Sequence, residues 1–133
     1  RIMNLKKEIE NIEDIKLLVN EFYGKVRQDE LLKDIFESII KDRWPEHLDK
    51  MYTFWQTVLL GEHTYRGTPF PPHAVMPVEI EHFQTWLKLW AETVNEYFVG
   101  DKAERAIWQG QRMAEMFLSK IRYMRDTDSV PLN

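Results

Sequence analysis

Four prolines crowd into residues 69–77 of this chain. Each proline fixes its φ angle and lacks the backbone N–H that a helix interior needs, so residues 62–77 do not form ordinary helix. This segment is longer than the about two to eight residues that usually connect packed helices, and long connections are often functional. One histidine, His73, follows the Pro-Pro pair. We therefore expect a stiff support that holds the His73 imidazole between two helices.

The rest of the chain has the three- and four-residue apolar spacing of amphipathic helices. We expect a first helix capped by Asn11 and reaching Val26, a second capped by Asp29 and reaching Ile39, a third from about residues 42–45 to Gly61, a fourth over about 78–98 and a fifth over about 102–125. No stretch has the two-residue period of a strand. The predicted fold class is all-α.

Length and composition indicate one globular domain over residues 1–133, with a core at about 11–125 and a polar tail at 126–133. The net charge of −4 argues against nucleic acid and anionic membranes as partners. The absence of cysteine excludes disulfides and thiolate catalysis. We see neither an apolar run of about 20 residues nor a signal-peptide pattern, so a cytoplasmic location is the default expectation.

Four residues are candidates for chemistry. His73 has apolar neighbours, His47 begins the apolar stripe of the third helix, and Tyr23 and Trp86 lie on the inner faces of the first and fourth helices. Taken singly, each has an ordinary structural explanation: a histidine that stabilises a turn, a histidine at a core boundary, or an aromatic ring packed in the core. The residues alone leave these explanations open.

Taken together, several ordered fragments resemble the truncated haemoglobins, and more narrowly their third group, over about residues 11–120. The fragments are Glu21-Phe-Tyr-Gly-Lys-Val26, Trp44-Pro-Glu-His47, Phe54-Trp55 with Leu59-Leu-Gly61, Tyr65-Arg-Gly67, Pro72-His73 and Phe83-x-x-Trp86-Leu-Lys-Leu-Trp90. The resemblance implies a globin-like fold, shortened to a two-over-two helical sandwich around haem b, which is iron protoporphyrin IX.

The resemblance also implies roles for single residues. His73 would be the proximal iron ligand, Tyr23 and Trp86 would face a bound ligand on the distal side, and His47 would be the distal histidine at the haem edge. Pro45, two residues before His47, can stiffen or distort the start of the third helix, and this decides whether His47 points inward. His82 is interpreted as a boundary residue on a regular helix. Apolar walls would come from Phe36, Met51, Phe54, Trp55, Val75, Met76 and Phe83, and propionate partners from Lys50, Tyr65 and Arg66.

A histidine-ligated haem with an open sixth position implies reversible binding of O2, NO and CO. Two distal donors would retain oxygen tightly, which favours redox chemistry on oxygen or nitric oxide over oxygen transport. Nitric-oxide dioxygenase or peroxidase-like activity would need an external reductase, because the chain has no glycine-rich nucleotide loop. A monomer or weak homodimer is expected.

Two alternatives remain from the sequence. The chain could be a cofactor-free helical interaction module whose aromatic residues only fill a core. It could also be a non-haem metal enzyme that uses His47, His63, His73 and His82. Each of Glu46, Glu62 and Glu81 directly precedes a histidine, but adjacent helical residues point in different directions, and no H-E-x-x-H spacing is present.

Overall fold

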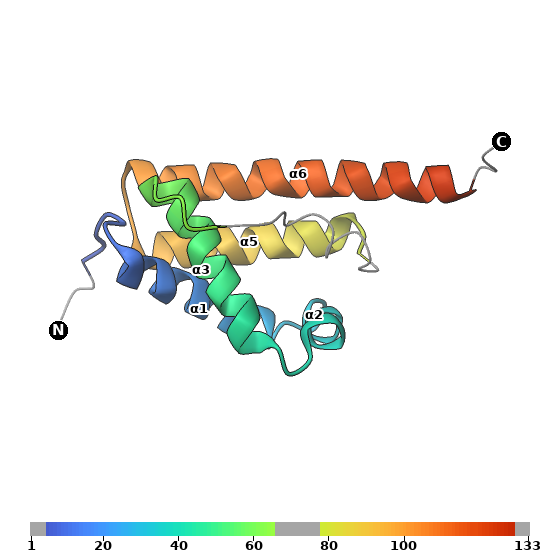
Figure 1. Ribbon diagram of the computed structural model, residues 1–133, viewed down its shortest axis with the longest axis horizontal. Coiled ribbons are helices and arrows are strands. Elements are labelled where there is room, and N and C mark those ends of the chain that lie inside the picture. Colours follow the sequence, from blue (N-terminus) through green and yellow to red (C-terminus); the bar gives the residue numbers. More distant parts are fainter. Residues whose placement is uncertain (1–4, 66–77, 130–133) are drawn as a thin grey trace.

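The computed structural model describes residues 5–65 and 78–129 of the chain, with side chains as far as Asp126. These residues form the helices α1 (Ile12–Val26), α2 (Lys33–Ile40), α3 (Trp44–Leu60), α5 (Ile80–Tyr97) and α6 (Asp101–Ser129) (Figure 1). An isolated bridge between Lys7 and Phe98 is the one β-type pairing in the described part. The all-α expectation is therefore confirmed for these residues. The predicted site residues Arg66, His73, Val75 and Met76 lie outside them.

Local sequence signals account for most helix ends. The side chain of Asn11 accepts a hydrogen bond from the backbone N–H of Asp14 (3.1 Å), which caps α1 as predicted. Gly61 ends α3 with a φ angle of 70°, a left-handed conformation that glycine adopts without steric cost. Pro45 lies in the first turn of α3, where a proline is tolerated.

Two predicted boundaries differ from the structure. Asp29 does not cap α2: its carboxylate accepts hydrogen bonds from the backbone N–H groups of Leu31 and Leu32 (3.0 Å each) and orders the turn before the helix begins at Lys33. Helix α6 continues past the predicted end at Arg125 to Ser129. Its last residues contain neither proline nor glycine, so nothing in the sequence stops the helix there.

The helices form two packed pairs. Helix α1 packs against α3, α5 packs against α6, and α1 also contacts α5. In Figure 1, α5 and α6 lie side by side, α6 extends beyond α5, and α3 crosses in front of the pair. The buried core residues come from all of these helices, so the core is continuous between the two pairs. This arrangement leaves α2 at one end of the α1–α3 pair.

Trp90 is the centre of an aromatic cluster and is 1% exposed. Its ring stacks on Trp55 (centroids 4.5 Å apart) and on Trp86 (6.0 Å), and Phe22 meets it edge-on (5.0 Å). The indole N–H of Trp90 donates to the carbonyl of Ala106 in α6 (2.9 Å). The cluster therefore joins α1, α3, α5 and α6 at one place.

Gly110 allows α6 to approach this cluster closely. A Cβ atom at Gly110 would lie 2.9 Å from Cδ1 of Trp90 and 3.4 Å from Cζ3 of Trp86. We expect Gly110→Ala to lower the free energy of unfolding by about 1–3 kcal/mol in urea denaturation, because overpacking outweighs the better helix propensity of alanine.

The matched control is Gly24→Ala in α1, where nothing lies within 4 Å of the added Cβ. That substitution should stabilise the protein by about 0.5–1 kcal/mol. A stabilisation of similar size in both variants would contradict the close packing at Gly110.

Candidate functional site

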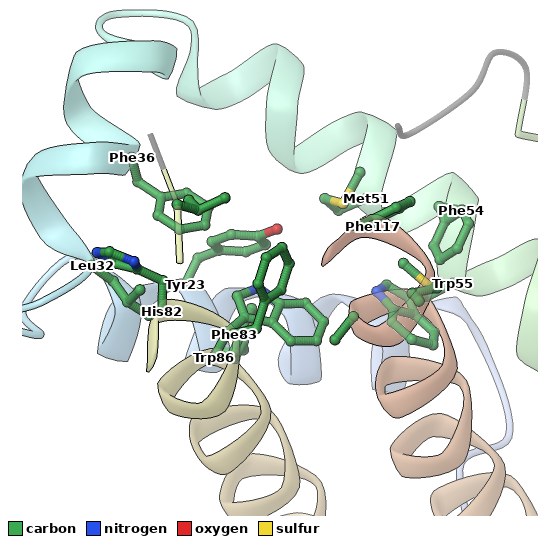
Figure 2. Close-up of a pocket in the computed structure, with 14 residues that line it drawn as sticks. Tyr23, Leu32, Phe36, Met51, Phe54, Trp55, His82, Phe83, Trp86 and Phe117 are labelled. Carbon is green, nitrogen blue, oxygen red and sulfur yellow. The ribbon is translucent and has the colours of Figure 1, made fainter. Parts of the chain in front are cut away.

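A pocket lies between the two helix pairs, with walls from each of the described helices and from Val78, two residues before α5 (Figure 2). We call it the central pocket; its empty volume is about 760 Å³, open solvent at its mouth included. Its walls are almost entirely apolar and aromatic. The lining residues are Phe22, Tyr23, Leu32, Phe36, Met51, Phe54, Trp55, Val78, His82, Phe83, Trp86, Met113, Ala114 and Phe117.

Tyr23 brings a hydroxyl group to the wall that α1 forms. Helix α1 places it against Phe22, whose ring it meets edge-on (centroids 4.9 Å apart), and only 7% of the residue is exposed. Figure 2 shows its hydroxyl oxygen pointing into the pocket. Burial raises the pKa of the Tyr23 phenol well above its ordinary value of 10. The hydroxyl therefore stays protonated, and it can donate a hydrogen bond, throughout the physiological pH range.

Two tryptophans add indole N–H groups to the pocket walls. Trp86 turns its Cζ3 edge toward Gly110, and Trp55 stacks on Trp90. Among the described residues, neither indole N–H has an acceptor, and neither does the Tyr23 hydroxyl, whereas the N–H groups of Trp44 and Trp90 are both hydrogen-bonded.

Polar groups inside native proteins are seldom left without a hydrogen-bond partner. Three donors on residues that line one apolar pocket therefore point to a ligand that accepts hydrogen bonds there.

His47 stands beside Tyr23. Its ring meets the Tyr23 ring edge-on (centroids 5.1 Å apart) and the Trp44 ring likewise (5.6 Å), and its Nε2 atom is shielded from solvent. Pro45 thus leaves the start of α3 regular, and His47 is turned inward. His47 does not itself line the central pocket.

Several of the predicted wall residues line the central pocket. Phe36, Met51, Phe54, Trp55 and Phe83 all line the pocket, with Tyr23 and Trp86 among them.

The predicted propionate partners lie elsewhere. Lys50 is exposed on α3, and the half-buried Tyr65 packs its ring against Phe54 (5.2 Å), but neither lines the pocket. Their roles stay predictions, as do those of His73 and the other residues outside the described part.

His82 was expected to be a boundary residue on a regular helix; it is half-buried in α5, and it also lines the pocket. In Figure 2 it lies at one end of the pocket beside Leu32, while Phe54 and Trp55 lie at the other. Its Nδ1 accepts a hydrogen bond from the backbone N–H of Glu79 (2.9 Å), which completes a capping box at the start of α5. The spacing Glu79-x-x-His82 was the available signal, with histidine in the place of the usual Glu or Gln.

Sequence reasoning did not assign the other wall residues to a site. These are Phe22, Leu32, Val78, Met113, Ala114 and Phe117. Helical spacing is compatible with inner faces for Phe22, Leu32 and the three α6 residues, but it does not separate a residue that lines a cavity from one that fills a core.

No described helix is both long and apolar enough to cross a membrane. Among the described side chains, no group of three or more histidine, aspartate or glutamate residues is arranged to hold a metal ion.

The family model and the relatives that match this chain in sequence and in structure are globins. The model of the family described as bacterial-like globin matches residues 7–119. A group 3 truncated hemoglobin of Campylobacter jejuni is 36% identical over 117 residues, which cover 85% of this chain and 92% of the relative. The crystal structure of a group III truncated hemoglobin from the same organism aligns with a TM-score of 0.80 at 35% identity, over 88% of this chain and 95% of that one. The chain therefore belongs to the bacterial-like globin family and is a truncated haemoglobin that resembles the third group.

Proposed function

We propose that this globin binds haem b in the central pocket, with His73 as the axial iron ligand and with Tyr23, His47 and Trp86 on the ligand-binding side. The proposed ligands are O2, NO and CO. One observation carries the proposal: the Tyr23 hydroxyl and the Trp86 indole N–H belong to an apolar pocket in which neither has an acceptor among the described residues.

The pocket suits a large flat cofactor. Helical cores are close-packed, so an apolar pocket that opens between the two helix pairs is suited to an occupant. The aromatic and methionine walls match the apolar faces of a porphyrin, and the open mouth gives charged propionates a route to solvent. The same features make a cofactor-free interaction module a poorer explanation.

When bound, haem supplies an iron ion that can take a small diatomic ligand and undergo one-electron redox chemistry. The chain supplies the surroundings. Tyr23 and Trp86 can each donate a hydrogen bond to the partly negative outer atom of a diatomic ligand in the pocket. Each such bond contributes roughly 0.5–1.5 kcal/mol, so two would slow ligand escape by about tenfold to a hundredfold.

Retention of this strength favours chemistry over delivery. Phe36, Met51, Phe54 and Phe83 give the pocket apolar walls, which disfavour water beside a bound ligand and so limit its side reactions. We propose redox chemistry on oxygen or nitric oxide, with electrons from an external reductase. Lys50, Tyr65 and Arg66 remain the proposed propionate partners.

Titration of the purified protein with haem tests this proposal. We expect one haem per chain, an intense Soret absorption band, and further spectral shifts when the reduced protein is exposed to carbon monoxide or oxygen. Ala114→Trp, which fills the pocket from α6, should weaken haem binding, whereas Met116→Trp on the exposed side of the same helix should not. A reduced protein that binds neither gas would refute the proposal.

A further inference from the structure

We propose that Trp44 is a positioning residue for the ligand-binding side of the central pocket. It holds the rings of Tyr23 and His47 in place, and it is itself held by Glu37 and Arg27. This inference rests on the proposed function, because it assumes that the Tyr23 hydroxyl serves a ligand in the pocket.

Three aromatic rings contact one another beside the pocket. Trp44 meets Tyr23 edge-on (centroids 5.7 Å apart, planes at 65°) and meets His47 edge-on (5.6 Å, 90°). Tyr23 and His47 also touch each other (5.1 Å, 84°), so the three rings form a closed triangle. Edge-to-face contacts are directional. A tilt of Trp44 therefore moves the other two rings.

Two charged side chains fix Trp44 itself. Its indole N–H donates to Oε1 of Glu37 (3.1 Å), and the Arg27 guanidinium donates to the same oxygen (3.0 Å). The guanidinium carbon also lies 4.4 Å from the centroid of the Trp44 ring, within the range of a cation–π contact. Trp44 is thus held at its edge and over its face by two charged side chains.

These contacts join three helices at one corner. Arg27 is the residue that ends α1, Glu37 lies in α2, and Trp44 is the first residue of α3. Arg27 and Glu37 are about half exposed, so their ion pair alone would add little stability. Their shared partner is a tryptophan that is only 6% exposed. The corner therefore fixes an inward-facing ring from the surface of the protein.

The direction in which the Tyr23 hydroxyl can donate depends on the orientation of its ring. A hydrogen bond weakens steeply when the donor tilts away from its acceptor, and functional groups need positioning to about 0.5 Å and 10–20°. No hydrogen bond from another described residue holds the Tyr23 hydroxyl. The direction of the hydroxyl then depends on the residues that pack against the Tyr23 ring, and Trp44 is one of them.

The test uses the carbon monoxide and oxygen complexes of the haem-loaded protein. Trp44→Leu should broaden or shift the infrared C–O stretching band and raise the oxygen dissociation rate about fivefold, and Glu37→Leu should raise that rate about threefold. Glu37→Gln keeps an acceptor oxygen and should rescue both measurements to near the wild-type values. The control is Trp108→Leu, which removes an exposed tryptophan that also lies beside two arginines, and it should change neither.

A double substitution tests the route of the effect. If Trp44 acts through Tyr23, then Trp44→Leu should change the oxygen dissociation rate less than about 1.5-fold when Tyr23 is already phenylalanine. A full fivefold effect in the Tyr23→Phe background would overturn the inference.

A purely structural role predicts a different result. It would lower the unfolding temperature of Trp44→Leu and Glu37→Leu but leave the C–O band and the dissociation rate at wild-type values, and that result would overturn the inference while the proposed function stands. If Trp44→Leu does not fold, Glu37→Leu at the exposed corner decides by the same criterion. A wild-type protein that binds no carbon monoxide overturns the proposed function and this inference with it.

Discussion

Replacing His73 by glycine should abolish stable haem ligation. We expect the haem-loaded variant to lose the spectrum of a histidine-ligated haem and to release its haem at least about a hundredfold faster, because the loss of an axial ligand outweighs the loss of any supporting contact. The measurements are the absorption spectrum and the rate of haem transfer to an excess of a haem-scavenging protein.

Two further measurements make this result specific. Imidazole added to His73→Gly should restore the wild-type spectrum, since a free ligand can occupy the space that the side chain leaves. The control His63→Gly removes an exposed histidine after α3 and should leave haem release unchanged. A His73→Gly protein that keeps the wild-type spectrum without imidazole would remove His73 from the proposed role.

The helices could be predicted from the sequence where local signals decide them. The Asn11 cap and the Gly61 stop depend on residues next to the helix end, and both are confirmed. Asp29 was placed wrongly as a helix cap because the same carboxylate can satisfy either a cap or the turn before it. The length of α6 was underestimated because a polar run without proline or glycine is compatible with both helix and frayed chain.

The site could be predicted only in part, because a pocket depends on tertiary packing. Spacing showed that Tyr23 and Trp86 face inward, and the resemblance to truncated haemoglobins grouped them. Spacing did not show that Phe117 lines a cavity while Ile121, one turn later, fills the core. The corner of Arg27, Glu37 and Trp44 was also missed, since charged residues in separate helices give no sign in the sequence that they share a partner.

Tyr23→Phe should speed oxygen release about tenfold. The substitution keeps the ring and removes one donor, and about 1.4 kcal/mol of lost hydrogen bonding corresponds to a factor of ten in rate. Stopped-flow displacement of oxygen by carbon monoxide measures the change. An unchanged rate would remove Tyr23 from the distal role.

The same substitution should not destabilise the protein without haem. There the hydroxyl lacks a hydrogen-bond partner among the described residues, so replacing it by hydrogen should leave the free energy of unfolding unchanged or raise it by up to about 1 kcal/mol. The control Tyr52→Phe removes a hydroxyl that donates to the side chain of Asn20 on the outer side of α1. It should lower the free energy of unfolding and leave oxygen release unchanged.

The two tyrosines therefore separate function from stability. A hydroxyl that serves only the fold is satisfied within the protein, as at Tyr52, and its removal affects unfolding alone. A hydroxyl kept for a ligand is left unsatisfied until the ligand arrives, so its removal affects ligand release without a loss of stability. If Tyr23→Phe instead destabilised the haem-free protein as much as Tyr52→Phe does, the Tyr23 hydroxyl would have a partner within the chain, and the main support for a polar ligand in the central pocket would be lost.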